Sequence, residues 1–269
     1  MKNSYPISFL KYFLIMSKKQ PLVSCLCVSS NRPEFLKNTI KYFEAQTYPN
    51  KELIIVSNHF SQEYKEIVDS INSSDIKYYF LSNDRKVTLG ELRNYSIKMS
   101  GGEYFCIWDD DDWYHRNRLK IQLQEAVRNN KPATIMPYFI LFNKVKRQGA
   151  LSHLYPIQGS ILCRKKIITE GLKYPSMNIS EDRNFAEKLY ECNAFFPVIN
   201  PSLYIYIYHG TNTWNEGHFD FFYERGYKLS PELNQIIEDI ITNKYNYEKS
   251  SELLDSPDVL KEFNYFYQR

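Results

Sequence analysis

SGGEYFCIWDDDDWYHRNRLKIQ (Ser100–Gln122) carries four consecutive aspartates, Asp109 to Asp112, directly after a short apolar run. The apolar run is typical of a buried strand, and the Gly101-Gly102 pair before it marks the end of a helix. Neighbouring carboxylates repel one another, so burying part of this charge is costly unless a cation compensates for it. One or two aspartates would fit the start of a helix, whereas four favour a site for a hard divalent cation and phosphate oxygens.

Strands and helices are expected to alternate on the N-terminal side of this stretch. Apolar segments predict strands at 22–30, 51–58, 75–82 and 103–108, and helical spacing predicts helices at 32–46, 62–71 and 88–100. Such βαβ units form a mostly parallel, doubly wound sheet that binds ligands at the C-terminal ends of its strands. The aspartates would lie at that edge. Residues 132–143 and 144–150 are expected to be strands on the far side of the sheet.

The composition is that of a folded enzyme-sized domain. The chain has 269 residues, of which 43% are hydrophobic and 24% charged, so it can bury a sizeable core and is not disordered. Its formal net charge of +3 is too small for a protein that coats nucleic acid. The five cysteines are odd in number and lie mostly in apolar runs, which indicates reduced thiols in a cytoplasmic protein.

Motifs in five segments, in order along the chain, make it similar to the family 2 glycosyltransferases, which have the GT-A fold. Gly-Glu-Tyr, the apolar strand and the Asp-x-Asp-Asp run resemble the central signature of that family. The other four are the opening strand with its Asn-Arg turn, the Gln-x-Tyr-Pro turn, the Arg-Asn helix and the Glu-Asp motif at residues 180–189. The resemblance covers residues 21–215. It implies transfer of a sugar from a nucleotide-diphosphate-sugar to a hydroxyl of a glycan or glycoconjugate.

The resemblance implies a role for each carboxylate of the run. Asp111 would ligate the Mn²⁺ or Mg²⁺ that bridges the donor diphosphate. Asp109, the other aspartate of the Asp-x-Asp motif, would share the metal or face the sugar side. Asp110 would contact the donor, and Asp112 would support the metal or the donor sugar. Further residues fall where the family contacts the nucleotide: Ser29, Asn31, Arg32 and Arg93.

The acceptor hydroxyl has a very high pKa, so a carboxylate must take its proton as attack proceeds. The resemblance assigns that role to Asp182, implies inversion, and leaves Glu181 to orient Asp182 or touch the acceptor. Asp182 and Asp111 come from different segments, as expected of groups on opposite faces of the anomeric carbon. The alternative is that Asp182 stabilises the first turn of a helix capped by Ser180, and both can hold.

His209 ends the alternating segment YIYIYHG, where it could reach the metal as a third ligand. Several glycosyltransferases of this fold have such a histidine. The alternative is a histidine at a strand end that hydrogen-bonds to the backbone. His218 is a weaker candidate.

The chain departs from the family at the end of the second strand. Ser57 and Asn58 stand where relatives have an Asp-Asp pair whose second member accepts a hydrogen bond from uracil N3–H. The carbonyl of Asn58 can still accept that bond, but an amide can also flip and donate. UDP is therefore the expected nucleotide, with dTDP and GDP left open.

The chain is expected to have three parts: a leader at 1–20 that is disordered or amphipathic, a GT-A domain at 21–215, and a helical extension at 216–269. The spacing of Ile236, Ile237, Ile240 and Ile241 predicts the helical extension. This extension could pack on the domain, form a homodimer or contact a membrane. A cytoplasmic enzyme, with peripheral contact to the membrane left open, is the expected location.

Two other classes of function fit part of the sequence. Nucleotidyltransferases and metal-dependent phosphohydrolases also use clustered aspartates, but they have no need of Asp182, and their own loop motifs are absent from the sequence. A non-catalytic nucleotide- or glycan-binding relative would explain the change at Ser57 and Asn58. The intact aspartate run and Asp182 count against it.

Overall fold

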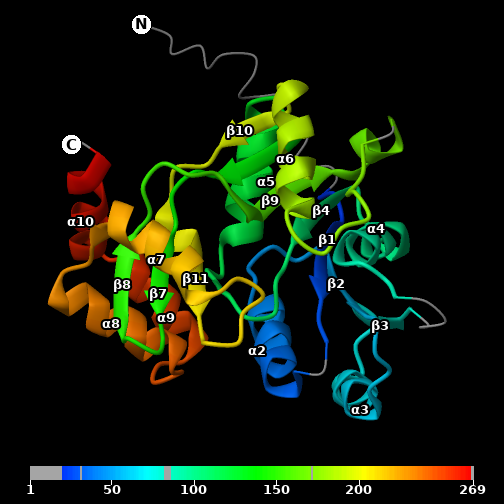
Figure 1. Ribbon diagram of the computed structural model, residues 1–269, viewed down its shortest axis with the longest axis horizontal. Helices are drawn as coiled ribbons and strands as arrows, with labels where there is room; N and C mark the ends of the chain where they lie inside the picture. Colours follow the sequence, from blue (N-terminus) through cyan, green and yellow to red (C-terminus); the bar gives the residue numbers. More distant parts are fainter. Residues whose placement is uncertain (1–19, 31, 82–85, 171, 268–269) are drawn as a thin grey trace, which may run out of the picture.

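The computed structural model describes residues 20–30, 32–81, 86–170 and 172–267 (Figure 1). The expected leader lies almost wholly outside the described residues, and so does Asn31. The described chain forms two sheets with helices packed around them.

The larger sheet has seven strands in the order β10-β6-β9-β4-β1-β2-β3. The strands β1, β2, β3 and β4 are parallel neighbours, as the alternating sequence pattern predicted. β9 is antiparallel to both of its neighbours, β4 and β6. The strand bounds are β1 Val23–Val28, β2 Lys51–Ser57, β3 Ile76–Phe80, β4 Tyr104–Ile107, β6 Ala133–Met136, β9 Ile157–Arg164 and β10 Phe195–Pro197.

Helices cover both faces of this sheet. Alternate residues of β1 explain why: Cys25 and Cys27 belong to one hydrophobic core, and Leu26 to the other. The apolar residues of α2 and α5 join the first core, and those of α4 and α6 join the second. The helix bounds are α2 Pro33–Glu44, α3 Gln62–Ile71, α4 Leu89–Met99, α5 Arg118–Arg128 and α6 Glu181–Glu191, with a 3₁₀ helix at Lys165–Glu170.

A second sheet of five strands, in the order β12-β8-β7-β11-β5, stands beside the aspartate run. The expectation that residues 132–150 extend the main sheet is therefore correct only for β6. β7 and β8 leave it, because β7 pairs with β11, which follows some sixty residues later in the chain. The bounds are β5 Trp113–Tyr114, β7 Ile140–Asn143, β8 Gln148–Leu151, β11 Tyr204–Tyr208 and β12 Tyr227–Lys228.

The C-terminal part is helical, as its apolar spacing predicted. The helices are α7 Glu216–Arg225, α8 Pro231–Ile241, α9 Tyr247–Leu254 and α10 Pro257–Tyr267. Ile237, Leu254 and Phe263 belong to the same hydrophobic core as the second sheet. No helix in the described part of the chain is long and apolar enough to span a membrane. Peripheral membrane contact and a homodimer stay predictions.

Candidate active site

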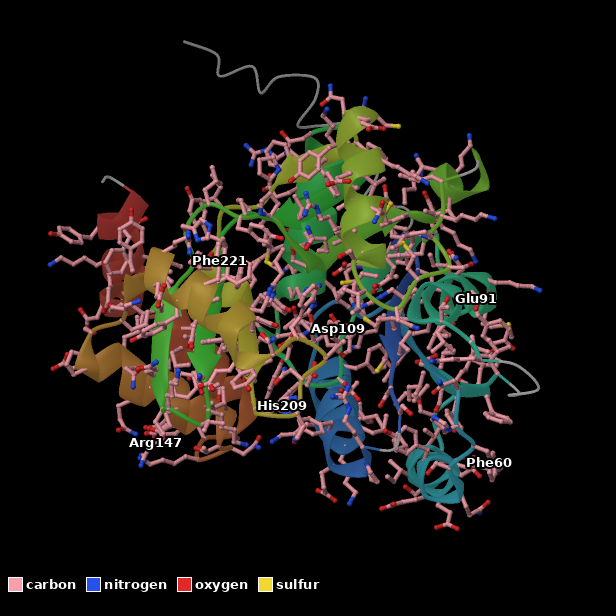
Figure 2. The ribbon with its side chains drawn as sticks, viewed as in Figure 1. Phe60, Glu91, Asp109, Arg147, His209 and Phe221 are labelled. Carbon is pink, nitrogen blue, oxygen red and sulfur yellow. The ribbon has the colours of Figure 1, made fainter. Side chains whose placement is uncertain are left out.

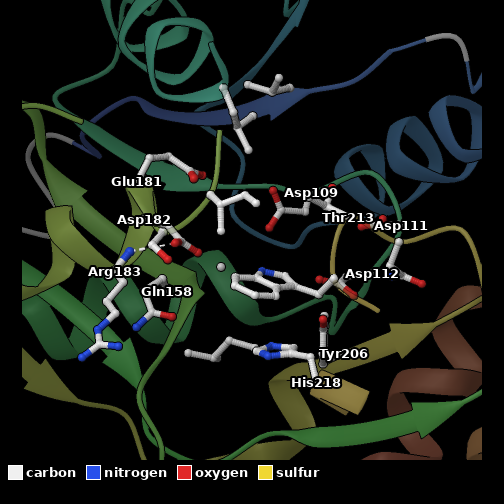
Figure 3. Close-up of a pocket in the computed structure, with 18 of the residues that line it drawn as sticks. Asp109, Asp111, Asp112, Gln158, Glu181, Asp182, Arg183, Tyr206, Thr213 and His218 are labelled. Carbon is white, nitrogen blue, oxygen red and sulfur yellow. Dashed lines mark hydrogen bonds between the residues drawn. The ribbon is translucent and has the colours of Figure 1, made fainter. Parts of the chain in front are cut away.

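A cavity of about 370 Å³ opens where β1 and β4 end. Its walls come from the aspartate run after β4, from β11, from the start of α6 and from α7. Figure 2 shows Asp109 near the middle of the molecule, between the two sheets. Figure 3 shows Glu181 and Asp182 on one side of the pocket, and Asp109, Asp111 and Asp112 on the other. The sequence prediction that both carboxylate groups share one site is consistent with this placement.

The aspartates of the run turn to different partners. Asp110 accepts hydrogen bonds from the Ser29 hydroxyl and from Arg32. Arg32 Nη1 also donates to Asp111 Oδ2 over 3.0 Å, and His209 Nε2 lies 3.3 Å from the same oxygen. The loop after β1 and the end of β11 therefore meet at Asp111.

Asp112 joins the run to the second sheet. It accepts a hydrogen bond from the Tyr204 hydroxyl, and the backbone N–H of Ile207 donates to its Oδ1 over 3.0 Å. The side chain of Asp112 is buried and lines the cavity. These contacts fix its position, and its predicted support of the metal or the donor sugar stays a prediction.

The surroundings of Asp110, Asp111 and Asp112 shift their pKa values in different directions. Burial and the charge of Asp111 raise the pKa of Asp110 to about 7, although Arg32 and Ser29 oppose the rise. Burial and the neighbouring carboxylates raise the pKa of Asp112 well above its usual range. Burial also disfavours the anion of Asp111, but His209 and Arg32 outweigh it and hold the pKa of Asp111 below its usual range. Asp111 is thus the member of the run best suited to remain an anion.

The described residues include no group of three or more His, Cys, Asp or Glu side chains already spaced to hold a metal ion. Asp111 and His209 nevertheless fit one as a pair, because neighbouring ligands of an octahedral ion with 2.0–2.1 Å bonds lie roughly 3 Å apart. Thr211 Oγ1 lies 3.0 Å from His209 Nδ1 and orients the ring, as partners of metal-binding histidines do. Waters or phosphate oxygens would complete the shell.

Arg93 links the two sides of the cavity. Its Nε donates to Glu181 Oε1 over 3.1 Å, and its Nη2 lies 3.4 Å from Asp109 Oδ1. Burial raises the pKa of both carboxyl groups, and Arg93 acts against that rise in each. The predicted contact of Arg93 with a nucleotide is untested. In the structure its guanidinium contacts the two acids.

Glu181 and Asp182 begin α6 but differ in exposure. Both line the cavity, but Glu181 is buried against Arg93, whereas Asp182 is half-buried and accepts a bond from Arg183 N over 2.7 Å. Ser180 stands at the cap position with a left-handed φ of 63° and makes no side-chain cap bond. The helix-start alternative therefore lacks the expected serine cap.

The predicted nucleotide contacts are only partly gathered at the cavity. Arg32 lines it, and Ser29 reaches it through Asp110. Ser57 uses its hydroxyl locally, donating to the His59 carbonyl over 2.8 Å. Asn58 is half-buried and is not among the described residues that line the cavity. Its predicted contact with the base stays a prediction.

Three supporting residues were missed in the sequence. The Tyr64 hydroxyl lies 2.8 Å from Ser29 Oγ and accepts from the N–H of Arg32. Tyr204 holds Asp112, as described above. Arg118 is fully buried and donates to the carbonyls at the end of β4 and in β9, at 3.0 Å each. Tyr204 left a signal, because strand alternation in YIYIYHG places it on the same face as Tyr206.

Curated relatives are glycosyltransferases. An uncharacterised glycosyltransferase of Methanocaldococcus jannaschii is 27% identical over 208 residues, which is 70% of this chain and 71% of that protein. A putative colanic acid biosynthesis glycosyl transferase of Escherichia coli, WcaA, is 32% identical over 142 residues, 52% of this chain and 50% of that protein. The match with GlyG of Streptococcus pneumoniae spans 39% of that protein, so the chain matches less than two thirds of some relatives.

Solved glycosyltransferase structures share the fold. TarS of S. aureus in complex with UDP-GlcNAc aligns with a TM-score of 0.58 and 14% identity, over 82% of this chain and 72% of that chain. The mannosyltransferase PcManGT of Pyrobaculum calidifontis, in complex with GDP-Man and Mn²⁺, aligns with a TM-score of 0.54 and 12% identity, over 91% of this chain and 79% of that chain. The predicted GT-A fold is confirmed.

The model of glycosyl transferase family 2 matches residues 24–184. That range holds β1, the aspartate run and the start of α6, so it contains both sides of the cavity. It covers more than half of the chain and confirms the resemblance that the motifs indicated. The chain belongs to glycosyl transferase family 2.

Proposed function

We propose that this glycosyltransferase moves a sugar from a UDP-sugar to a hydroxyl of a glycan or glycoconjugate, with inversion and with Mn²⁺ or Mg²⁺ as cofactor. One observation supports this most directly: Asp182 and Asp111 lie on opposite sides of one cavity of about 370 Å³. A cavity of that size suits a small ligand. A base and a leaving-group site that face each other are what an inverting displacement needs.

The leaving-group side has two nitrogen groups beside Asp111. Arg32 and His209 both contact Asp111 Oδ2, so a diphosphate placed there would meet a guanidinium and an imidazole. Asp111 and His209 would hold the divalent cation, and Asp109 remains a predicted further ligand. When bound, the cation would act as a Lewis acid that stabilises the negative charge of the departing diphosphate.

Asp182 would act as the general base. The acceptor oxygen forms a bond to the anomeric carbon, the bond from that carbon to the diphosphate oxygen breaks, and the acceptor proton passes to Asp182. Of the two acids at the start of α6, Glu181 is tied to Arg93, so Asp182 is the one left to meet the acceptor. Glu181 would hold the helix start in place.

The nucleotide is proposed as UDP. TarS was solved with UDP and with UDP-GlcNAc, but PcManGT was solved with GDP-Man. Ser29, Asn31, Arg32 and Asn58 are proposed to contact the nucleotide, with Asn58 accepting from the base. A cytoplasmic location is part of the same proposal.

The test is release of nucleotide diphosphate from a panel of UDP-, dTDP- and GDP-sugars with Mn²⁺. We expect slow hydrolysis of one donor, lost with a chelator and with Asp111→Asn. Asp182→Asn should still bind that donor but lose turnover by about 10²-fold or more. Asp69→Asn is the matched control, because Asp69 is an exposed residue of α3 paired only with Lys65. Full turnover in Asp182→Asn would refute its role as the base, and hydrolysis that survives the chelator would refute metal dependence.

A further inference from the structure

One wall of the cavity is aromatic, and none of the roles above uses it. The rings of Trp214 and His218 stack, with centroids 4.4 Å apart and planes 18° from parallel. The edge of Phe222 meets His218 at 5.0 Å, and Tyr155 packs against Phe222 at 4.8 Å. All four line the cavity. His218 and Phe222 are four residues apart, so they share one face of α7.

Trp214 is the open member of this wall. It is 39% exposed, whereas Trp108 and Trp113 are 0% and 1% exposed and belong to the core. The ring nitrogens of His218 have no hydrogen-bond partner among the described residues. The indole of Trp214, stacked on the imidazole of His218, forms an apolar plane with polar edges. Apolar surface of this kind inside a polar pocket is typical of a ligand site.

The wall lines the same cavity as the proposed base Asp182. Figure 3 shows His218 and Tyr206 low in the view, below Asp112, with Asp182 and Gln158 at the left of the pocket. Burial lowers the pKa of His218, while the negative charge of Asp182 acts in the opposite direction.

A pyranose ring matches these surroundings. Its axial C–H groups give it one apolar face, which an aromatic plane attracts, and its hydroxyls lie around the rim. Gln158, Asp182 and Thr213 line the cavity beside the wall and can meet hydroxyls. An open-chain polyol has no rigid apolar face and would gain little from the same wall.

We propose that Trp214 and His218 form a stacking platform for a pyranose ring of the acceptor. The acceptor is then a pyranoside, and not an open-chain polyol. This inference rests on the proposed function, because it needs the same cavity and the base Asp182.

The chain offers a matched control on the same helix. Phe221 is an aromatic residue of α7 that is 45% exposed, is not among the described residues that line the cavity and lies under the guanidinium of Arg225 at 3.8 Å. Its ring meets the wall residue Phe222 at 5.4 Å, so Phe221→Ala removes a ring that packs against the wall but does not line the cavity. Trp214→Phe keeps an aromatic plane at the wall, so it separates loss of stacking from general damage.

The experiment compares transfer with hydrolysis in the full chain, using the donor found above. The probes are methyl pyranosides and the alditols of the same sugars, and the readout is acceleration of nucleotide release together with product detected by mass spectrometry. We expect at least one pyranoside, and no alditol, to act as acceptor. Trp214→Ala should lower the ratio of transfer to hydrolysis about five- to tenfold. Trp214→Phe should restore most of that ratio, and Phe221→Ala should leave it unchanged.

Failure of the inference and failure of the proposed function look different. If the wild-type protein hydrolyses no donor with Mn²⁺, the proposed function fails and the inference falls with it. If a donor is hydrolysed but alditols serve as well as pyranosides, or no pyranoside is an acceptor, only the platform is refuted. An unchanged ratio in Trp214→Ala would refute it as well.

Discussion

Replacing Arg93 with methionine should cost more stability than any change among the surface ion pairs. Arg93 is only 11% exposed and lies between Glu181, at 3.1 Å, and Asp109, at 3.4 Å. Methionine keeps much of the apolar stem but leaves both carboxylates without their cation. The start of α6 and the end of β4 would then lose the charge that joins them.

The magnitude follows from the exposure of each partner. Glu181 is 3% exposed, and removing one partner of a buried ion pair costs about 3–5 kcal/mol. Asp109 is 26% exposed, so the longer contact with it adds about 0–1 kcal/mol. Protonation recovers part of this loss, because burial already raises the pKa of both carboxyl groups. We expect a net loss of about 3 kcal/mol at pH 7.

The pH dependence of the loss has a definite sign. Without Arg93, the folded-state pKa of Glu181 rises further above its unfolded value. A carboxyl group of that kind favours folding fully below its unfolded pKa and loses this contribution as pH rises through its folded pKa. The difference between Arg93→Met and the wild type should therefore shrink in acid and grow towards neutral pH.

Urea denaturation followed by circular dichroism measures the loss, and a double-mutant cycle with Glu181→Gln assigns it to the pair. We expect a coupling energy of about 2 kcal/mol. Arg183→Met is the control, since Arg183 is 69% exposed and its partner Glu187 54%, so its loss should stay below about 0.5 kcal/mol. A loss below about 1 kcal/mol in Arg93→Met, or no coupling with Glu181, would refute the reasoning.

Three further predictions concern the main sheet and the site. Glu52→Gln should cost about 2–3 kcal/mol at pH 7, because Lys77, Ser24 and the N–H of Gly101 bind this buried carboxylate. Burial opposes its ionisation, but these contacts outweigh burial and lower the pKa of Glu52, so its stabilisation is present above the unfolded pKa and lost as pH falls through the folded pKa. Urea titrations at neutral and acid pH check this, and a loss that does not change with pH would contradict it. Tyr204→Phe should lower the free energy of unfolding by about 1 kcal/mol and lower kcat for donor hydrolysis, because Asp112 then keeps only the hydrogen bond from the Ile207 N–H. Tyr208→Phe is the control. Equal kcat in both variants would contradict the role of Tyr204 in holding Asp112. Gly90→Ala should lower the melting temperature and turnover together, since its Cβ would lie 1.8 Å from the Pro175 carbonyl oxygen, and an unchanged melting curve would show that the loop before α6 yields freely.

The parallel half of the main sheet was predictable because its signals are local. β1, β2 and β4 are short apolar runs, and the helices between them carry their own apolar spacing. The second sheet was not predictable in this way. β7 and β8 have four residues each, and their sheet depends on β11, which follows much later in the chain.

The separate roles of the four aspartates could not have been predicted from their own sequence. They are identical residues in one unbroken run, and residue type alone treats them alike. What distinguishes them comes from distant segments: Asp110 and Asp111 meet Arg32 after β1, and Asp112 meets β11. The result is a lowered pKa for Asp111 between two neighbours whose pKa values are raised. Tertiary contacts, which the residue types do not encode, therefore give Asp111 its distinct pKa.

The C-terminal helix α9 contacts the residues that follow the aspartate run. The Tyr247 hydroxyl of α9 donates to the carbonyl of Tyr114, and the His115 ring donates to the carbonyl of Ser251 over 3.1 Å. Tyr114 and His115 follow directly after Asp112 and Trp113, so α9 holds the strand that fixes where the aspartate run ends. Residues 216–267 supply both this support and, through His218 and Phe222, the aromatic wall of the cavity. The family model matches up to residue 184, so it does not include these C-terminal contributions to the site.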